Sequence, residues 1–490
     1  MDSLLGAVIK IVLIYAGSGE SSSSEQPPSG PQVQRPPKPT KSPKPTSPPM
    51  DLLPSEILSD IFSYCLPDLL GGPQAQSFRR SRAAPLTLLR VCRRWRDVVV
   101  TTPVLWTCIA VEQTKQGCAP PLPVLQQWLK RSGACGLSLD VLVHSNAGAS
   151  YSSAHAAQMF KTLLAVYSRW REVRLCVPTS LQRAVQGDIL HLESREAPML
   201  ESLSFTLEMA EFETSSPGGI LDVEEIVARA PRLTNLAWDY QYPTPMFRAG
   251  AGWSRLTRIT TGTTLALRDC YSFLQACPQL ESCHLLRAYD GWALGGDATP
   301  PLTMSRLKEL FIITKSADFQ PLLDLLTLPA LRSLELSRVS ERFREDDRSS
   351  APLRHLALRS EFTLEHLVLH NLELNESELI GFLKMVSESL TELDVLEIGT
   401  RISARIIYAL TLQPHPEKLL CPQLKMIKLR GGVAASDGQL IAMVQSRRNP
   451  RADACVLKDI QVEFNEGGGH FLDRAGLRAL RKDGLRAYIF

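Results

Sequence analysis

A short leucine-based phrase recurs along the second part of the chain, and it limits the possible folds more than any other feature. The phrase is Leu-x-x-Leu-x-apolar, where x is any residue. Successive first leucines are 23 to 34 residues apart, and a period of this size is typical of chains built from stacked, similar units. The first leucines of the ten phrases are Leu200, Leu233, Leu256, Leu280, Leu307, Leu331, Leu364, Leu390, Leu424 and Leu457.

Each phrase predicts a short β-strand, because alternate residues of a strand point to opposite faces and the phrase ends in alternating apolar residues. Segments with helical spacing precede several phrases, at 222–229, 268–276, 376–386 and 439–445. A proline stands two residues before the first leucine in five phrases, where it ends the preceding helix. The repeated order of helix, proline, strand and loop predicts an α/β fold with parallel strands and a layer of helices.

This pattern resembles the leucine-rich repeat of the long, ribonuclease-inhibitor-like kind, which implies a curved solenoid. We expect the repeat domain to cover residues 107–490, with a terminal cap at 485–490. A further copy of the phrase at Leu353 is expected to add a strand. A doubly wound α/β domain is the alternative, but such a sheet does not require the phrase ten times. Less regular early units are expected as strands at 105–111, 137–143 and 173–177 and as helices at 123–130 and 158–167.

Before the repeats, residues 50–106 contain two amphipathic segments that predict a small helical module. In residues 53–66, apolar side chains recur every three to four positions, which is the spacing of one helix face. Pro54 suits the first turn of this helix, where a missing N–H group is no loss. Residues 88–99 repeat the spacing, with arginines on the other face. A core of about fifty residues is marginal alone, so we expect the module to pack against the next domain or a partner.

The module contains Leu-Pro-x-Glu-Ile-Leu from residue 53, Ile-Phe at 61–62, Val-Cys-Arg-Arg-Trp-Arg from residue 91, and Pro-x-Leu-Trp ending at Trp106. Together these stretches resemble an F-box, and the closing one is most similar to the fungal branch of that family. The resemblance implies binding to the Skp adaptor of a cullin-based ubiquitin ligase. A helical hairpin that shares the pattern by chance is the alternative. By position, the contact or core residues would be Leu53, Pro54, Ile57, Leu58, Ile61, Phe62, Val91, Cys92 and Trp95.

Composition favours a soluble interaction protein. The chain is 44% hydrophobic and 21% charged, which is ordinary for globular proteins. Its net charge of +3 gives no general attraction to nucleic acid or to anionic membranes. The eleven cysteines are scattered and form no Cys-x-x-Cys pair. This usage argues for reduced thiols and a cytoplasmic and/or nuclear location, and against a disulfide framework or a zinc module.

The N-terminal region divides into a short apolar segment, 1–17, and a Pro/Ser-rich linker, 18–49. The apolar run at 4–16 is shorter than the ~20 residues that a membrane-spanning helix needs. Its Met-Asp-Ser start lacks the basic stretch of a signal peptide. We therefore expect no membrane partner. The linker has too little apolar surface to offset the entropy of folding, so it is predicted to be disordered.

The sequence contains no phosphate loop, no nucleophile elbow and no His-Glu-x-x-His, which are common catalytic or metal-binding patterns. We therefore expect a chain without enzymatic activity or cofactors. His366 and His370 are four residues apart, but in a strand that spacing is ~13 Å, too far for one metal ion. The long loop at 68–85 and the following helix bring seven arginines between Arg79 and Arg96. They are open to three readings: nucleic-acid binding, an acidic partner, or a solvated surface.

Residues that alternate with the buried positions of each phrase are expected to face the concave side of the solenoid. In the later repeats these residues are charged, and Lys428 and Arg430 form a basic pair suited to a phosphorylated or acidic target. Ordinary solvated positions are the alternative for each of them. The residues most expected to bind a target are His366, His370, Glu392, Asp394, Lys428 and Arg430. Further candidates on the same side are Glu309, Phe311, Glu335, Asp459 and Glu463.

The resemblance to F-box proteins with leucine-rich repeats implies a non-catalytic substrate-recognition adaptor of an SCF-type ubiquitin ligase. Its expected partners are the Skp adaptor, the cullin scaffold and an unknown target protein bound by the repeats. Two alternatives stay open. One is a leucine-rich-repeat scaffold that takes no part in a ligase, and the other is a protein associated with nucleic acid through its arginines and basic linker.

Overall fold

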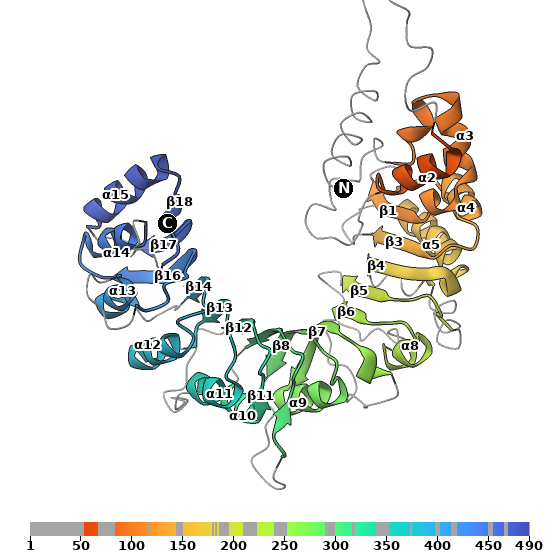
Figure 1. Ribbon diagram of the computed structural model, residues 1–490. Coiled ribbons are helices and arrows are strands. Elements are labelled where there is room, and N and C mark those ends of the chain that lie inside the picture. Colours follow the sequence, from red (N-terminus) through yellow and green to blue (C-terminus); the bar gives the residue numbers. More distant parts are fainter. Residues whose placement is uncertain are drawn as a thin grey trace, which may run out of the picture. The chain divides into compact units, whose positions relative to one another are not determined.

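A computed structural model of the chain gives its architecture (Figure 1). The predicted apolar segment 1–17, the linker 18–49 and most of the loop 68–85 lie outside the residues it describes. The chain divides into two compact units, Met1–Leu200 and Glu201–Phe490, so the predicted boundary at 106/107 lies inside the first unit. The structure describes residues 53–66, 84–114, 117–143, 150–178, 181, 184–185, 196–208, 223–239, 252–289, 299–315, 319–339, 352–372, 375–396, 402–412, 419–448, 454–464 and 469–489.

The first unit begins with short helices and continues as alternating strands and helices. Strand β1 pairs in parallel with β3, β3 pairs in parallel with β4, and β2 adds to β1 in the antiparallel sense. The strands and helices expected at 137–143, 173–177 and 123–130 are therefore confirmed. The elements are α2 (Ser55–Ser63), η3 (Leu88–Arg90), α3 (Arg93–Thr101), η4 (Pro103–Trp106), β1 (Cys108–Thr114), β2 (Gly117–Ala119), α4 (Leu122–Arg131), β3 (Leu137–Leu142), α5 (Ser150–Leu164), η5 (Tyr167–Arg169) and β4 (Trp170–Pro178).

The second unit repeats one pattern, in which a strand is followed by a helix or a short turn and then by the next strand. The elements up to β12 are β5 (Ser202–Glu208), α8 (Val223–Arg229), β6 (Asn235–Asp239), η6 (Trp253–Arg255), β7 (Arg258–Ala266), α9 (Leu267–Ala276), β8 (Ser282–Tyr289), β9 (Leu302–Thr303), β10 (Glu309–Thr314), α10 (Gln320–Leu323), β11 (Leu326–Thr327) and β12 (Ser333–Arg338). Those that follow are α11 (Pro352–Ser360), β13 (His366–His370), α12 (Glu376–Met385), β14 (Glu392–Leu396), β15 (Ile402–Ser403), α13 (Ala404–Leu410), β16 (Met426–Ala434), α14 (Gln439–Arg448), β17 (Asp459–Phe464), α15 (Phe471–Lys482) and β18 (Arg486–Ile489).

The strands of the second unit form one long parallel sheet in chain order. The order is β5-β6-β7-β8-β10-β12-β13-β14-β16-β17-β18, while β15 lies beside β16 and β9 pairs separately with β11. Over the described residues this order is open, with no closure into a barrel. Consecutive helices from α9 to α15 contact one another and lie along one side of the strands (Figure 1). The fold is thus mixed α/β with a long parallel sheet, an arrangement compatible with a solenoid.

All ten predicted phrases form strands, and each strand begins two residues after the first leucine of its phrase. The ten first leucines are completely buried. The second leucine position of each phrase also points under the helices, and neighbouring strands place these residues side by side. One such row across the middle of the sheet is Leu310, Leu334, Leu367, Leu393 and Ile427. At ~25 cal/mol per Å² of apolar surface buried, this row is a main source of stability.

Buried or half-buried arginines link successive strand–helix segments of the second unit. Arg447 in α14 is completely enclosed, and its guanidinium donates to the carbonyl oxygens of Leu410, Leu420 and Cys421 at 2.7–2.9 Å. Burial lowers the pKa of Arg447 to about 10. The last carbonyls of a helix have no partner within the helix, and the negative end of its dipole favours a cation there. Arg255 and Arg359 make the same kind of contact with carbonyls near the ends of α8 and α10.

Two sequence predictions are wrong in detail. The phrase at Leu353 forms helix α11 instead of a strand, because Leu353, Leu356 and Ala357 also have the spacing of a buried helix face. The segment 88–99 is not one helix, since it breaks at Cys92, whose Sγ accepts the Trp95 N–H at 3.4 Å and caps α3. None of the helices among the described residues is both long enough and apolar enough to cross a bilayer.

Candidate functional site

The second unit has a sheet face that the helices do not cover, which we call the open face. Along most of these strands buried residues alternate with partly exposed ones, as in β13, whereas in β14 Asp394 is itself buried between Leu393 and Val395. The partly exposed residues of neighbouring strands stand side by side in parallel register. A central row of the open face therefore consists of His284, Phe311, Glu335, Val368, Asp394, Lys428 and Gln461.

All six residues predicted to bind a target lie on this open face. His366 and Glu392 are direct neighbours in the register of β13 and β14. Asp394 and Lys428 are neighbours in the register of β14 and β16. His370 and Arg430 stand one row further along their strands. Sequence spacing alone thus identified residues that the fold brings together, although binding by them stays a prediction.

Asp394 is the centre of an ion network. Arg430 NH2 lies 2.7 Å from Asp394 Oδ1, and Lys428 Nζ lies 3.2 Å from Oδ2. His370 Nε2 is 3.4 Å from the same Oδ1 and 2.9 Å from the Arg430 guanidinium. The role of His370 Nε2 depends on its tautomer: it accepts from Arg430 when it carries no proton and donates to Asp394 when it carries one. The carboxylate is thereby shared by two cations and one imidazole on three adjacent strands.

The electrostatics of Asp394 follow from this network. Burial alone would raise the pKa of Asp394, but His370, Arg430 and Lys428 outweigh it and bring the pKa down to about 2. Asp394 is therefore charged at every physiological pH. Its charge neutralises the basic pair, so Lys428 and Arg430 are not a free binding site for a phosphorylated or acidic target. A second carboxylate, Glu392, is held at 3.1 Å from His366 Nδ1.

Glu335 occupies the same row two strands away and has different neighbours. Its register partners are Phe311 on one side and Val368 on the other. Among the described residues, its carboxylate makes no hydrogen bond and no ion pair. Burial raises its pKa, against the more distant influence of His370, Lys428 and Arg430. The central row of the open face therefore carries one paired carboxylate, Asp394, and one unpaired carboxylate, Glu335.

The helical module of the first unit is the other candidate site. The fully buried residues Leu58 and Phe62 of α2 meet Trp95 of α3, and the Phe62 and Trp95 rings are 4.7 Å apart. Trp106 closes this core, where its Nε1 donates to the Val99 carbonyl at 2.8 Å. The module is not isolated, because Trp106 also packs edge-on against Trp128 of α4.

The nine residues that the F-box resemblance assigns to the Skp interface divide into three groups. Leu58, Phe62 and Trp95 are core residues of the module and support its surface from inside. Leu53, Ile61 and Val91 are partly buried against that core. The exposed members are Pro54, Ile57 and Cys92, and the side chain of Ile57 is 45% exposed. Ile57 is thus an exposed apolar side chain that a partner could bury, as are Tyr64 and Val104 of the same module.

Two of the described arginines of the module, Arg94 and Arg96, have a structural role. Arg94 of α3 donates to the Leu53 carbonyl, which ties α3 to the chain just before α2. Arg96 donates to the Leu89 carbonyl at 3.1 Å. Arg90 and Arg93 are exposed, and Arg79, Arg80 and Arg82 lie outside the described residues. This arrangement gives the nucleic-acid alternative no specific support.

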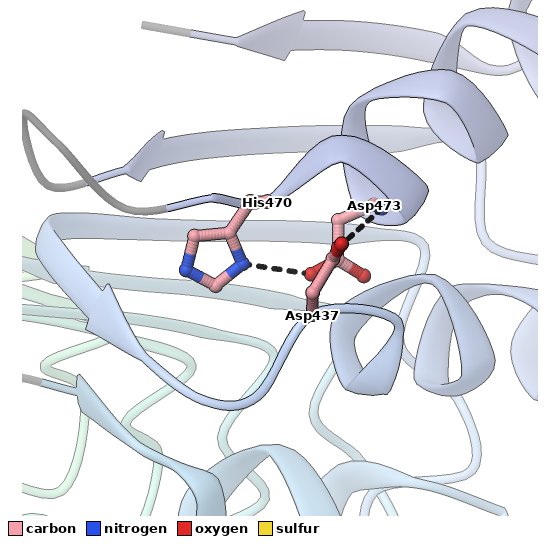
Figure 2. A group of neighbouring side chains, drawn as sticks. All are labelled: Asp437, His470 and Asp473. Atoms are coloured by element: carbon pink, nitrogen blue, oxygen red, sulfur yellow. Dashed lines mark hydrogen bonds and ion pairs between the residues drawn. The ribbon is translucent and has the colours of Figure 1, made fainter.

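A group that sequence reasoning missed lies near the C-terminus. Ligand atoms of Asp437, His470 and Asp473 lie within 4.8 Å of one another, the spacing of a metal site. Figure 2 shows the His470 ring directed at Asp473, with Nδ1 and Oδ2 2.9 Å apart. Asp437 Oδ1, however, accepts the N–H groups of Leu472 and Asp473 at 2.9 and 3.1 Å.

These contacts give the group a structural explanation. Asp473 Oδ1 accepts the Ile441 N–H at 2.8 Å, so both carboxylates cap helix starts, one in α15 and one in α14. Burial would raise the pKa of Asp437, but the N–H groups of Leu472 and Asp473 and nearby His470 lower it below its usual value. The oxygens that would bind a metal are thus already used by backbone donors. We interpret the group as a structural contact that links the starts of α14 and α15 within the second unit.

Comparison with known proteins identifies no family. The chain matches no protein-family model, and no curated protein matches it. It is similar to a Bacteroides fragilis protein whose crystal structure was determined as a structural-genomics target. That match has 15% sequence identity and a TM-score of 0.30, and it covers 69% of this chain and 83% of the other. A likeness this small supports no functional conclusion.

Proposed function

We propose that the protein is the substrate-recognition subunit of an SCF-type ubiquitin ligase. In this function it catalyses nothing. The helical module binds the Skp adaptor, the cullin scaffold joins through that adaptor, and the open face binds a target protein. The target is thereby held near a ubiquitin-conjugating enzyme, which raises its effective concentration and orients its lysines.

The observation that carries the proposal is the division of the F-box-like residues between core and surface. The residues of α2 and α3 that match the motif build a compact core around Phe62 and Trp95. The same motif leaves Pro54 and Ile57 at the surface. An interaction module needs both a rigid inside and an apolar patch outside. A helical hairpin that matched by chance would have no reason to combine them.

The second unit supports a role in recognition. Its ten leucine phrases form adjacent parallel strands, and we propose that they are leucine-rich repeats of the ribonuclease-inhibitor-like kind. Each strand contributes a few variable, partly exposed residues to the open face, which suits it to bind an extended segment of another protein. Together with the cysteine usage, this function places the protein in the cytoplasm and/or nucleus.

Direct binding of the full chain to the purified Skp adaptor tests the proposal. Ile57→Asp is expected to weaken binding by about thirtyfold, because it places an unpaired carboxylate in an apolar contact. Leu358→Asp is the matched control, since Leu358 is an exposed apolar residue of α11 in the other unit. It should leave adaptor binding unchanged.

Failure of the folded wild-type chain to bind the adaptor would contradict the ligase function. The protein would then be a repeat scaffold that takes no part in a ligase, and the open face would remain its binding surface. Equal adaptor binding by wild type and Ile57→Asp would instead show that α2 does not carry the contact.

A further inference from the structure

Charged side chains on the open face, and just before its strands begin, mostly pair across neighbouring strands. Each of these pairs joins an acid to a base whose atoms are within 3.2 Å. A partner gains little charge attraction from such pairs, because each cation already has its anion. The pairs are Lys308–Glu281, Arg332–Glu365, His366–Glu392, Lys428–Asp394, Arg430–Asp394 and Arg486–Asp459.

Glu309 and Glu335 are exceptions to this pairing. Glu309 accepts a hydrogen bond from the Ser282 hydroxyl at 2.7 Å, and His284 lies 4.0 Å from it. Burial lowers the pKa of His284 below its usual value, so this imidazole is neutral at pH 7 and supplies no charge. Neither glutamate forms an ion pair with a lysine or arginine of the described chain. Two negative charges on β10 and β12 are therefore uncompensated.

The register neighbours of Glu335 are apolar, whereas Glu309 stands between Ser282 and Ser333. Phe311 stands beside Glu335 in register and lies two residues from Glu309 on the same strand. The Phe311 and His284 rings are 5.4 Å apart. Val368 flanks Glu335 on the opposite side. Carboxylates beside an aromatic pair match a lysine or arginine side chain, whose apolar stem packs on rings while its cation pairs with the acid.

We propose that β8, β10, β12 and β13 of the open face bind a basic segment of a target protein through Glu309, Glu335, Phe311 and His284. The proposal rests on the recognition role given above and names its partner class, a lysine- or arginine-containing segment in extended conformation. Glu335 takes one cationic side chain, which also lies over Phe311. Glu309, one row away, takes a second one.

Two other ligands fit this region less well. An acidic or phosphorylated segment would be repelled by both glutamates. The described cations close to this region are already paired, Lys308 with Glu281, Arg332 with Glu365, and Lys428 and Arg430 with Asp394. A metal ion has less support, because Glu309 and Glu335 belong to no group of three or more possible ligands among the described residues.

Selection of peptides by the full chain from a display library of random dodecapeptides tests the proposal. Peptides enriched in lysine and arginine are expected. The best of them, synthesised with a fluorescent label, should bind wild type with an affinity that falls as salt is added. Glu335→Gln and Glu309→Gln should each weaken binding by about tenfold, which is the loss expected for one charge-assisted contact.

Asp459→Asn is the matched control. Asp459 lies on the same face but is paired with Arg486, so its substitution should change peptide binding by less than about twofold. Selection of acidic or uncharged peptides, or of none, would overturn the proposal. So would equal loss of affinity in the control and in the two glutamine variants, since that would indicate a general effect of charge.

The chain's own linker contains Arg35, Lys38, Lys41 and Lys44 and is a competing occupant. If replacing these four residues by serine strengthens peptide binding in the full chain, the region is occupied by the linker and the proposal of a target segment fails. The adaptor-binding measurement is made with the same protein and tests the proposed ligase function separately. Peptide binding does not depend on the adaptor, so failure of one proposal can be distinguished from failure of the other.

Discussion

Asp394 and Glu335 lie in the same row of the same sheet, two strands apart. Their pKa values are shifted in opposite directions. The pKa of Asp394 falls to about 2, whereas that of Glu335 rises above its usual value. Asp394 is the more buried of the two, and burial raises the pKa of both carboxyl groups, so burial does not explain the opposite shifts. The difference comes from their neighbours, which are Lys428, Arg430 and His370 around Asp394, and Phe311 and Val368 beside Glu335.

The comparison separates two arrangements of charge on the open face. Around Asp394 the charges satisfy one another, so they hold three adjacent strands together and offer little to a partner. Around Glu335 a charge is kept without compensation among apolar groups, which costs some stability. A residue that costs stability and has no structural partner is a better candidate for recognition than one in a closed network.

The largest expected effect is that of Asp394→Asn. The substitution keeps the size of the side chain but leaves Lys428 and Arg430 without their anion. Because the Asp394 side chain is only 11% exposed, we expect the free energy of unfolding to fall by about 2 kcal/mol, below the 3–5 kcal/mol of a fully buried pair. Urea denaturation measures it.

Glu392→Gln is the control for this effect. The pair of Glu392 with His366 is about two-fifths exposed on both sides, so its loss should cost less than about 0.5 kcal/mol. If the two variants lose the same stability, burial does not distinguish the two ion pairs, and the view of Asp394 as a structural centre is wrong.

The next effect distinguishes the two cations of the network. Arg430→Met removes contacts with both Asp394 and His370 and is expected to cost about 1 kcal/mol. Lys428→Met removes a single, more exposed contact and should cost about half as much. Double-mutant cycles with Asp394→Asn measure each coupling. A larger coupling for Lys428 than for Arg430 would contradict the geometry.

Much of the second unit could be predicted from sequence because its signal is local. The phrase at Leu307, for example, contains its own strand, its buried leucines and the exposed positions between them. Alternation along the strand then places Glu335 and Asp394 on one face without knowledge of the fold. Leu353 shows the limit of this reasoning, since the same leucine spacing satisfies a helix, and the choice depends on what packs against it.

The contacts of the site could not be predicted in the same way. Which charges pair depends on register between strands that are 24 to 36 residues apart in sequence, as in His370–Asp394 and Arg430–Asp394. The phosphate-binding role considered for Lys428 and Arg430 lacked this information. Arg447 was also missed, because an arginine that caps carbonyls of a neighbouring unit has no partner in its own sequence window.

The smallest effect, that of Glu335→Gln, is the most specific test of the comparison. The change in unfolding free energy should stay within about 0.5 kcal/mol. The pH dependence of this change in unfolding free energy tests whether the charge of Glu335 opposes folding. Because the folded-state pKa of Glu335 is above the usual 4.5, its charge opposes folding at neutral pH, and this cost disappears as the pH falls below the unfolded-state value. The glutamine variant should therefore gain on wild type between about pH 4 and pH 7.

Asp394→Asn should show the opposite trend at lower pH. Its folded-state pKa of about 2 lies below the usual 3.8, so the stability supplied by the charge is present above the unfolded-state pKa and is lost as the pH falls towards 2. The deficit of the asparagine variant should therefore grow as the pH rises from about 2 to 4. Denaturation of both variants across this range separates the cases, and parallel trends would show that neighbouring cations do not set the two carboxylates apart.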